Sequence, residues 1–348
     1  MPVYTSRTVS EITRRIRAFL SLDVGLSRGE VPEPEHKLEQ VRQQLVSKNR
    51  KIAELQAKLA GEGTTVEAIG VKPENIIWIF GTPRSGSTWL GRMMSGLDGH
   101  ALWDEPRVGE LFGLFLTERG NHLRQDNEAF ILTKNRYQNV WLKPVRSLIL
   151  EGARARFPEA KHLTIKEPGG STGAPFLMEV MPESRMILLV RDPRDVAASM
   201  LAGAKKGGWI MEAKDLGDYW KQGDDDPDAY VERRARAYLT DVVNAKRAYE
   251  AHEGHKALVR YEDLRADTST VMQRIYSSLG VAVDGGELAR VVKKLSWENT
   301  PTEWKGEGKI YRKATPGDWR EDLTREQVAI VERITAPILS EFYPQTSR

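Results

Sequence analysis

Residues 76–90, IIWIFGTPRSGSTWL, decide the fold of this chain. The first five, 76–80, are all β-branched or aromatic, which predicts a short strand buried on both faces. A glycine-containing loop follows, and residues 87–97 predict a helix directly behind it. A buried strand that leads through a tight loop into a helix is the first unit of a parallel sheet covered by helices.

The loop has the G-x-x-x-x-G spacing of a phosphate-binding loop, with Gly81 and Gly86 at its ends. Backbone N–H groups of such a turn, and of the helix N-terminus behind it, converge on an anion. Ser87 stands where ATP-binding loops carry a lysine, and the cation of this loop is Arg84. The loop therefore predicts an anion site unlike that for ATP, and a plain strand-to-helix turn is the alternative.

Short apolar strands and helices continue to alternate along the chain. This pattern predicts an α/β, P-loop-like three-layer fold with a central parallel sheet flanked by helices, spanning residues 71–348. Asp226 can cap a helix that begins with Pro227. The further predicted strands are 162–166, 186–190 and 257–260, and the further predicted helices are 194–203, 227–252, 269–280 and 324–342.

Residues 1–70 predict a separate N-terminal helical extension with a short coiled-coil segment and a linker. Residues 11–20 predict a basic amphipathic helix, which can lie on a membrane surface or dock on its own domain. Residues 36–60 carry apolar side chains at heptad spacing, which can pair in a homodimer or pack on the main domain. The glycine-containing residues 61–65 predict the linker.

The composition excludes several classes of function. With 52 Lys and Arg against 49 Asp and Glu, the net charge is +3, which does not favour a nucleic-acid partner. The chain has no cysteine, so disulfides and cysteine-ligated zinc are excluded, in keeping with a reducing cytoplasm. We expect no metal site because the 6 histidines are scattered. No signal peptide or apolar run of about 18 residues is visible, so we expect a cytoplasmic protein.

A second cluster of cationic and hydroxyl side chains lies in RDPRDVAASM, residues 191–200. Arg191 ends a predicted strand, Pro193 can start a helix, and Ser199 lies about two turns into that helix, so Arg191 and Ser199 can face one phosphate. P-loop kinases hold Mg²⁺ with a carboxylate at such a strand end. Asp192 is the candidate that would serve a kinase, which we keep as the alternative of a different class.

Four segments together resemble the PAPS-dependent sulfotransferase family, whose donor is 3′-phosphoadenosine 5′-phosphosulfate (PAPS). The similarity spans about residues 74–343, in the order of the family's motifs, and is closest in layout to bacterial and tyrosylprotein-type enzymes. Ala314 replaces a glycine of the family pattern. The segments are TPRSGSTWL, RDPRDVAAS, VRYEDL at 259–264 and RKATPGDWREDLT at 312–324.

The resemblance implies that the loop holds the 5′-phosphosulfate, and that the 191–199 and 312–313 segments hold the 3′-phosphate without a metal. It also implies that Trp89 and Tyr261 lie near the adenine, although each can equally be a core aromatic. The product would be 3′-phosphoadenosine 5′-phosphate (PAP). The implied nucleotide-binding residues are Arg84, Ser85, Gly86, Ser87, Thr88, Trp89, Arg191, Ser199, Tyr261, Arg312 and Lys313.

By analogy with phosphoryl transfer we expect an in-line transfer of the sulfuryl group, and the resemblance implies a glutamate base. Glu105 lies where tyrosylprotein-type enzymes carry the base, and Glu167 is its rival. Arg84 and Lys166 are the cations that would meet charge on the leaving oxygen. An inactive binding protein that works through residues 36–60 is a third hypothesis.

The acceptor follows less directly from the sequence. We expect loops at 106–145, 203–226 and 296–310 to shape its site. We expect a hydroxyl of a carbohydrate, glycolipid or lipid-linked precursor, with a small phenol, alcohol or natural product as the alternative. Trp141, Trp209, Trp220 and Trp304 can stack on sugar rings or belong to the core.

Overall fold

The computed structural model describes residues 70–116, 138–212, 225–306, 309 and 313–344. All of them belong to one compact unit, Ala68–Arg348. The predicted N-terminal extension lies outside the described residues, except for Gly70. The same holds for the candidate membrane helix at 11–20 and the heptads at 36–60.

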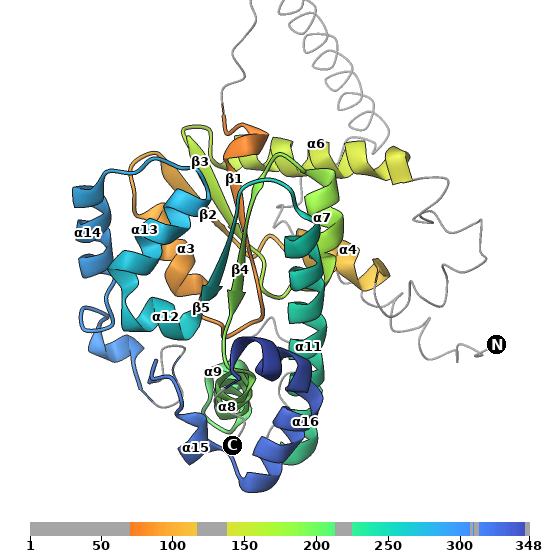
Figure 1. Cartoon of the computed structure of the whole chain (residues 1–348), viewed down its shortest axis with the longest axis vertical. Coiled ribbons are helices and arrows are strands. Elements are labelled where there is room, and N and C mark those ends of the chain that lie inside the picture. The colour runs from red at the N-terminus through yellow and green to blue at the C-terminus, as the bar shows by residue number, and fades with distance from the viewer. Residues whose placement is uncertain (1–69, 117–137, 213–224, 307–308, 310–312, 345–348) are drawn as a thin grey trace, which may run out of the picture. The chain divides into compact units, whose positions relative to one another are not determined.

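A five-stranded, wholly parallel sheet forms the centre of the fold, in the order β2-β3-β1-β4-β5 (Figure 1). Strand β1 lies in the middle, and its Trp78 pairs with Ile165 of β3 and Met186 of β4. The predicted parallel sheet is thereby confirmed. The strands are β1 Ile76–Phe80, β2 His100–Asp104, β3 His162–Lys166, β4 Arg185–Val190 and β5 Lys256–Arg260.

Helices follow the strands and cover both faces of the sheet (Figure 1). In the helix that begins at Pro227, the Asp226 side chain accepts the amide of Ala229, so the predicted cap is confirmed. No helix in the described ranges is long and apolar enough to cross a membrane. The α-helices are α3 Ser87–Ser95, α4 Val108–Leu116, α6 Gln138–Arg156, α7 Ala174–Val180, α8 Pro193–Ala204, α9 Trp209–Glu212, α11 Pro227–Ala251, α12 Tyr261–Ala266, α13 Thr268–Ser278, α14 Gly285–Lys294, α15 Trp319–Asp322 and α16 Arg325–Phe342. The short 3-10 helices are η1 Pro73–Asn75, η2 Ser171–Gly173 and η3 Thr302–Trp304.

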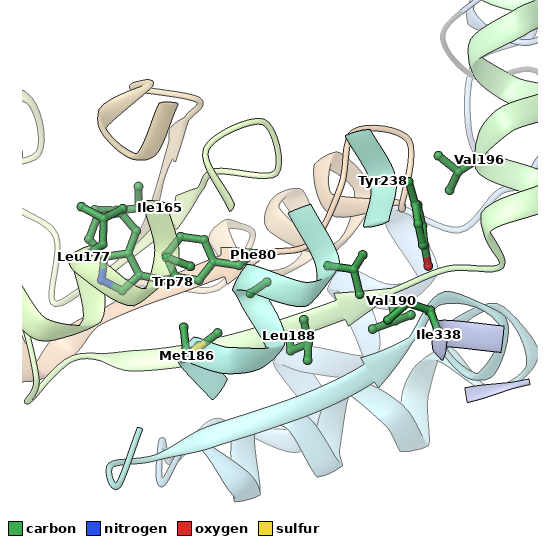
Figure 2. Close-up of a cluster of buried hydrophobic side chains, with 14 of the residues drawn as sticks. Trp78, Phe80, Ile165, Leu177, Met186, Leu188, Val190, Val196, Tyr238 and Ile338 are labelled. Carbon is green, nitrogen blue, oxygen red and sulfur yellow. The ribbon is translucent and has the colours of Figure 1, made fainter. Parts of the chain in front are cut away.

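Alternate residues of each strand enter two separate cores. Trp78 and Phe80 belong to a core with side chains of α6, α7, α8, α11 and α16, as Figure 2 shows in part. Ile77 and Ile79 belong to the opposite core, with α3, α13 and α14. Both faces of β1 are thus buried, which is why its sequence is apolar without alternation.

Some elements were not predicted. Strand β2 was missed because it lies at the sheet edge and is only half-buried, so it has no continuous apolar run. The prediction of an irregular segment over 106–145 is wrong in part, because α4 fills 108–116 and α6 begins at 138. Helix α14 was also missed. Within 203–226 and 296–310, the short helices α9 and η3 are present.

Helix α4 approaches η2 more closely than side chains would allow. A Cβ atom on Gly109 would lie 2.3 Å from the carbonyl oxygen of Gly170, and one on Gly173 would lie 2.3 Å from that of Gly109. The backbones therefore touch only because these residues are glycines. This contact fixes the start of α4 and, with it, the turn that leads out of β2.

We expect Gly109→Ala to lower the free energy of unfolding by about 1–3 kcal/mol, because the methyl group would overlap the backbone of Gly170. Gly285→Ala is the matched control, since nothing lies within 4 Å of a Cβ built there at the start of α14. It should be neutral or stabilise by up to about 1 kcal/mol. Urea denaturation of both variants measures the difference, and equal effects would contradict the close packing.

Candidate functional site

The site lies where the carboxyl ends of the strands meet. The phosphate-type loop follows β1, Glu105 follows β2, Lys166 ends β3, Arg191 follows β4 and Tyr261 follows β5. The chain leaves β1 between two neighbours, β3 and β4, that come later in sequence, so β1 is a topological switch point. Ligands of open parallel sheets bind in the crevice outside this edge.

Backbone geometry makes the two loop glycines necessary. A Cβ on Gly81 would lie 2.3 Å from the carbonyl oxygen of Leu189, and one on Gly86 would lie 2.5 Å from the ring of Tyr261. Gly86 also has a φ of 94°, which favours glycine. Arg84 has a φ of 72°, in the left-handed region that a residue with a Cβ rarely adopts. The loop is therefore held in one strained conformation.

Side chains from other elements hold this loop from below. The Ser171 hydroxyl accepts the amide of Gly81 at 2.8 Å, and the Thr82 hydroxyl donates to Asp241 at 3.3 Å. Burial raises the pKa of Asp241 well above its usual range. Behind the loop, the first helical bond of α3 runs from the amide of Leu90 to the carbonyl of Gly86 at 3.1 Å. The preceding amides therefore have no intrahelical acceptor.

A pocket opens above the loop, and its empty space, part of which is open to solvent, is about 840 Å³. The structure brings to it every nucleotide-binding residue implied by the sequence except Ser85 and Arg312. Ser85 is buried beneath the pocket, and Arg312 lies outside the described residues. The lining residues are Arg84, Gly86, Ser87, Thr88, Trp89, Arg191, Ser199, Tyr261, Arg265, Trp297, Thr300, Lys313, Ala314 and Asp318.

Five of these lining residues were not among the predicted nucleotide-binding residues: Arg265, Trp297, Thr300, Ala314 and Asp318. Ala314 and Asp318 do lie within the predicted C-terminal segment, 312–324. Arg265 lies four residues after Tyr261, about one turn along α12, so helical spacing could have indicated it. Trp297 and Thr300 lie in the 296–310 segment, which the sequence predicted as a loop that shapes the acceptor site and not as part of the nucleotide site. No local pattern places them at the pocket.

The charge of the pocket favours an anion, because it has four cationic side chains and one carboxylate, Asp318. Arg191 lies over the Tyr261 ring at 4.4 Å and donates from Nη1 to the carbonyl of Arg84 at 2.9 Å. Its Nε is buried and has no hydrogen-bond partner within the described ranges. A buried guanidinium donor without an acceptor fits a site that binds a phosphate.

Arg84 links two of the predicted anion-binding segments. Its Nε donates to the Ser199 hydroxyl at 3.0 Å, and its guanidinium lies 5.0 Å from the ring centre of Trp209. Trp209 therefore packs against the loop cation. The side chains of Trp141, Trp220 and Trp304 lie outside the described residues.

The C-terminal segment covers the pocket with Lys313 and Ala314. The Ala314 carbonyl accepts the Tyr261 hydroxyl at 3.2 Å and the Arg265 Nε at 3.1 Å. Ala314 has a φ of 56°, which explains why glycine suits this position. The Lys313 Nζ lies 3.4 Å from Glu321 and 3.3 Å from Asp322.

Aromatic rings form another wall of the pocket. Trp89 and Tyr261 meet edge to face, with ring centres 6.4 Å apart. The indole N–H of Trp89 donates to the Leu295 carbonyl at 2.8 Å. Tyr261 is only 4% exposed, so it both lines the pocket and belongs to the core.

Lys166 is the centre of a cluster beside the loop, and its side chain is only 3% exposed. Its Nζ lies 2.7 Å from Asp104 Oδ1, 2.7 Å from Glu105 Oε1 and 3.0 Å from Thr88 Oγ1. The ammonium thus has an acceptor for each of its three donors. Glu105 has a φ of 46°, and its amide donates to the Lys166 carbonyl at 3.0 Å.

Glu167, the rival carboxylate, has a different environment. It is 1% exposed, and its Oε1 accepts the amide of Val108 at 2.8 Å, at the start of α4. Burial raises the pKa of Glu167 to about 7, although the bond from Val108 lowers it, and the nearby charges of Glu105 and Glu110 add to the rise. Glu167 therefore anchors α4 beneath the site.

A loop of this kind, at the switch point of a parallel sheet and under a cationic, aromatic-walled pocket, is typical of nucleotide-binding α/β proteins. A model described as the sulfotransferase family matches residues 76–285, more than half of the chain. The chain belongs to the sulfotransferase family.

The individual proteins that this chain is similar to have low sequence identity with it. Cytosolic sulfotransferase 17 of Arabidopsis thaliana is 26% identical over 191 residues, which are 47% of this chain and 52% of that protein. The chain thus spans about half the length of that relative. Mouse sulfotransferase SULT7A1, complexed with PAP, is 15% identical with a TM-score of 0.49, over 80% of this chain and 90% of that chain. Sulfotransferase STF9 from Mycobacterium avium is 15% identical with a TM-score of 0.46, over 83% of this chain and 81% of that chain.

The raised pKa of Glu167 makes its contribution to stability depend on pH. Because the folded pKa of about 7 lies above the ordinary 4.5, folding favours the protonated acid. The contribution is complete below about pH 4.5 and is lost as the pH rises through about 7. The free energy of unfolding of the wild type, minus that of Glu167→Gln, should therefore fall by about 1–3 kcal/mol from pH 5 to pH 8. Chemical denaturation of both proteins at matched pH measures this difference. A difference that stays constant or rises with pH would contradict a buried Glu167 with a raised pKa.

Proposed function

We propose that the protein transfers the sulfuryl group of PAPS to a hydroxyl group of an acceptor. The observation that carries the proposal is the convergence on one pocket of cationic and hydroxyl side chains from three separate segments, the loop after β1, the start of α8 and residues 313–314. Family membership gives the class of chemistry. The nucleotide donor fits the pocket, which offers cations for phosphate groups and aromatic rings for a base.

In this proposal the loop and the start of α3 bind the 5′-phosphosulfate. Gly86, Ser87 and Thr88 supply amides at a helix N-terminus, where negative charge is favoured. Arg191, Ser199 and Lys313 bind the 3′-phosphate. The Nε of Arg191, which has no hydrogen-bond partner among the residues that the structure describes, supports this assignment. Arg312 is proposed for the same group from the sequence alone.

The base of the nucleotide would lie against the aromatic wall. Trp89 and Tyr261 line the pocket, and Trp297 adds a third ring that the sequence did not indicate. Arg265 approaches the Trp89 ring at 5.8 Å and so keeps a cation beside it. Flat aromatic faces suit a planar base because stacking needs area rather than precise hydrogen bonds.

The reaction forms a bond from the acceptor oxygen to sulfur and breaks the bond from sulfur to the phosphate oxygen. The acceptor proton passes to a base, and negative charge develops on the leaving phosphate oxygen. We propose Glu105 as the base, and Arg84 and Lys166 as the cations that stabilise the leaving oxygen. PAPS supplies the activated sulfuryl group, and the chain supplies orientation and charge.

Glu105 is favoured over Glu167 by its surroundings. The Glu105 side chain is 48% exposed, so an acceptor can reach it, and it contacts Lys166 at 2.7 Å. Glu167 is 1% exposed and its carboxylate is bonded to the amide of Val108. A base must reach the acceptor proton that it removes, and the buried position of Glu167 keeps an acceptor away from its carboxyl group.

The alternative of a P-loop kinase has little support from the residues of this chain. It would need Asp192 to hold Mg²⁺. Both Asp192 oxygens are bonded to Arg194, with Nη2 to Oδ2 at 2.7 Å and Nε to Oδ1 at 3.0 Å. Oδ1 also accepts the amide of Arg194 at 2.9 Å. Both oxygens of this carboxylate are therefore occupied by hydrogen bonds from Arg194 at the start of α8.

We propose a carbohydrate, glycolipid or lipid-linked hydroxyl as the acceptor, with a small phenol, alcohol or natural product as the alternative. Trp209 gives no support to sugar stacking, since it packs on Arg84. A cytoplasmic location, membrane contact through residues 11–20 and dimerisation through residues 36–60 stay predictions from the sequence. Incubation of a cell extract with labelled PAPS, with and without the protein, would identify the acceptor.

We expect the wild type to bind PAP in EDTA, because side-chain cations rather than Mg²⁺ meet its phosphates. Arg191→Ala should weaken binding at least tenfold, since charge-assisted hydrogen bonds are lost. Isothermal calorimetry measures both. Absence of PAP binding, or ATP binding that requires Mg²⁺, would overturn the proposal.

We expect Glu105→Gln to lower the rate of labelled sulfate transfer by about 10²–10⁴ while PAP still binds, because the amide cannot take the proton. Glu110→Gln is the matched control, a partly exposed glutamate five residues further on, and should transfer at the wild-type rate. If Glu167→Gln abolished transfer in a folded protein while Glu105→Gln kept it, Glu167 would be the base instead.

A further inference from the structure

A buried carboxylate, Asp195, joins two segments that are far apart in the sequence. It lies in the first turn of α8, is 2% exposed, and does not line the pocket. Its Oδ2 accepts the amide of Gly317 at 2.8 Å, and its Oδ1 accepts the amide of Trp319 at 3.1 Å. Both oxygens are therefore used to hold the backbone of the C-terminal segment.

The neighbouring residue, Arg194, holds the same segment by its side chain. The Arg194 guanidinium lies 4.2 Å from the ring centre of Trp319 and is fully buried. It is fixed by ion pairs to Asp192 at 2.7 Å and to Glu332 at 2.8 Å. The ring of Trp319 thus packs on a cation that cannot easily move, while Asp195 holds its amide.

The other end of residues 313–319 is held by Tyr261 and Arg265, whose side chains both donate to the Ala314 carbonyl. The segment presents Lys313, Ala314 and Asp318 to the pocket. The segment is therefore held at both ends. Tyr261 and Arg265 at one end line the pocket themselves, whereas Asp195 and Arg194 at the other end do not.

We propose that Asp195 is a positioning residue that fixes residues 313–319 over the pocket before the nucleotide binds, and so raises nucleotide affinity without touching the nucleotide. The inference rests on the proposed function for the identity of the nucleotide. Preorganisation of this kind raises affinity because binding then orders fewer residues. Two backbone amides that donate hydrogen bonds to one buried carboxyl group are strong enough to order a short segment.

The first test is hydrogen–deuterium exchange of the free protein. In Asp195→Ala the peptide that contains residues 313–323 should exchange at least tenfold faster, while peptides of β1 and β4 stay unchanged. Asp284→Ala is the matched control. Asp284 also accepts a backbone amide in the first turn of a helix, that of Glu287 at 2.7 Å in α14, and does not line the pocket. It should destabilise its own helix and leave residues 313–323 unchanged.

The second test is the affinity for PAP by calorimetry, with the KM for PAPS beside it. Asp195→Ala should raise the dissociation constant and the KM at least tenfold with little change in kcat, and Asp284→Ala should change neither. Asp195→Asn keeps one acceptor oxygen and should give intermediate values, which also decides the matter if the alanine variant does not fold.

Wild-type exchange or wild-type affinity in folded Asp195 variants would overturn the inference. Failure of the wild type to bind PAP would instead overturn the proposed function, because the exchange experiment uses no nucleotide.

Discussion

The parallel register of β2, β3 and β1 is the constraint on which the site depends. It places Asp104 directly beside Lys166, so that a carboxylate meets the buried ammonium at 2.7 Å. The ladder continues past the strand ends, where the amide of Glu105 donates to Lys166 and that of Glu167 donates to Ile79. A slip of one residue would turn Lys166 to the other face of the sheet. The proposed chemistry therefore follows from strand pairing before it follows from any loop.

The site also stores backbone strain that the rest of the fold must support. Within the described ranges, the non-glycine residues with left-handed backbone are Arg84, Glu105, Arg107 and Ala314, and all lie in the loops around the site. Such conformations persist only where surrounding contacts over-determine them. Here the contacts are the two cores on either face of the sheet, together with bonds such as that from Arg191 to the Arg84 carbonyl.

The sequence predicted those parts of the molecule that depend on neighbouring residues within one segment. The apolar runs identified every strand except β2, and the glycine spacing with Arg84 identified the loop. Strand β2 was missed because a half-buried edge strand need not be apolar throughout. The position of Trp297 and the two hydrogen bonds that Asp195 accepts from backbone amides were missed for another reason. They depend on contacts between distant segments, which no spacing within one segment records.

Glu105 and Glu167 follow neighbouring strands at the same edge of the sheet, but they differ in burial and in hydrogen bonding. Glu167 lies under α4, where burial raises its pKa and the amide of Val108 holds it, so its position and its charge are tied to the fold. Glu105 lies outside, half exposed, against Lys166. The same ammonium contacts Thr88 of the loop helix at 3.0 Å. If Glu105 takes the acceptor proton, its hold on Lys166 weakens while Asp104 and Thr88 still orient the ammonium. The cation is then available to the leaving oxygen at the moment when charge develops there, which couples the two halves of the proposed transfer.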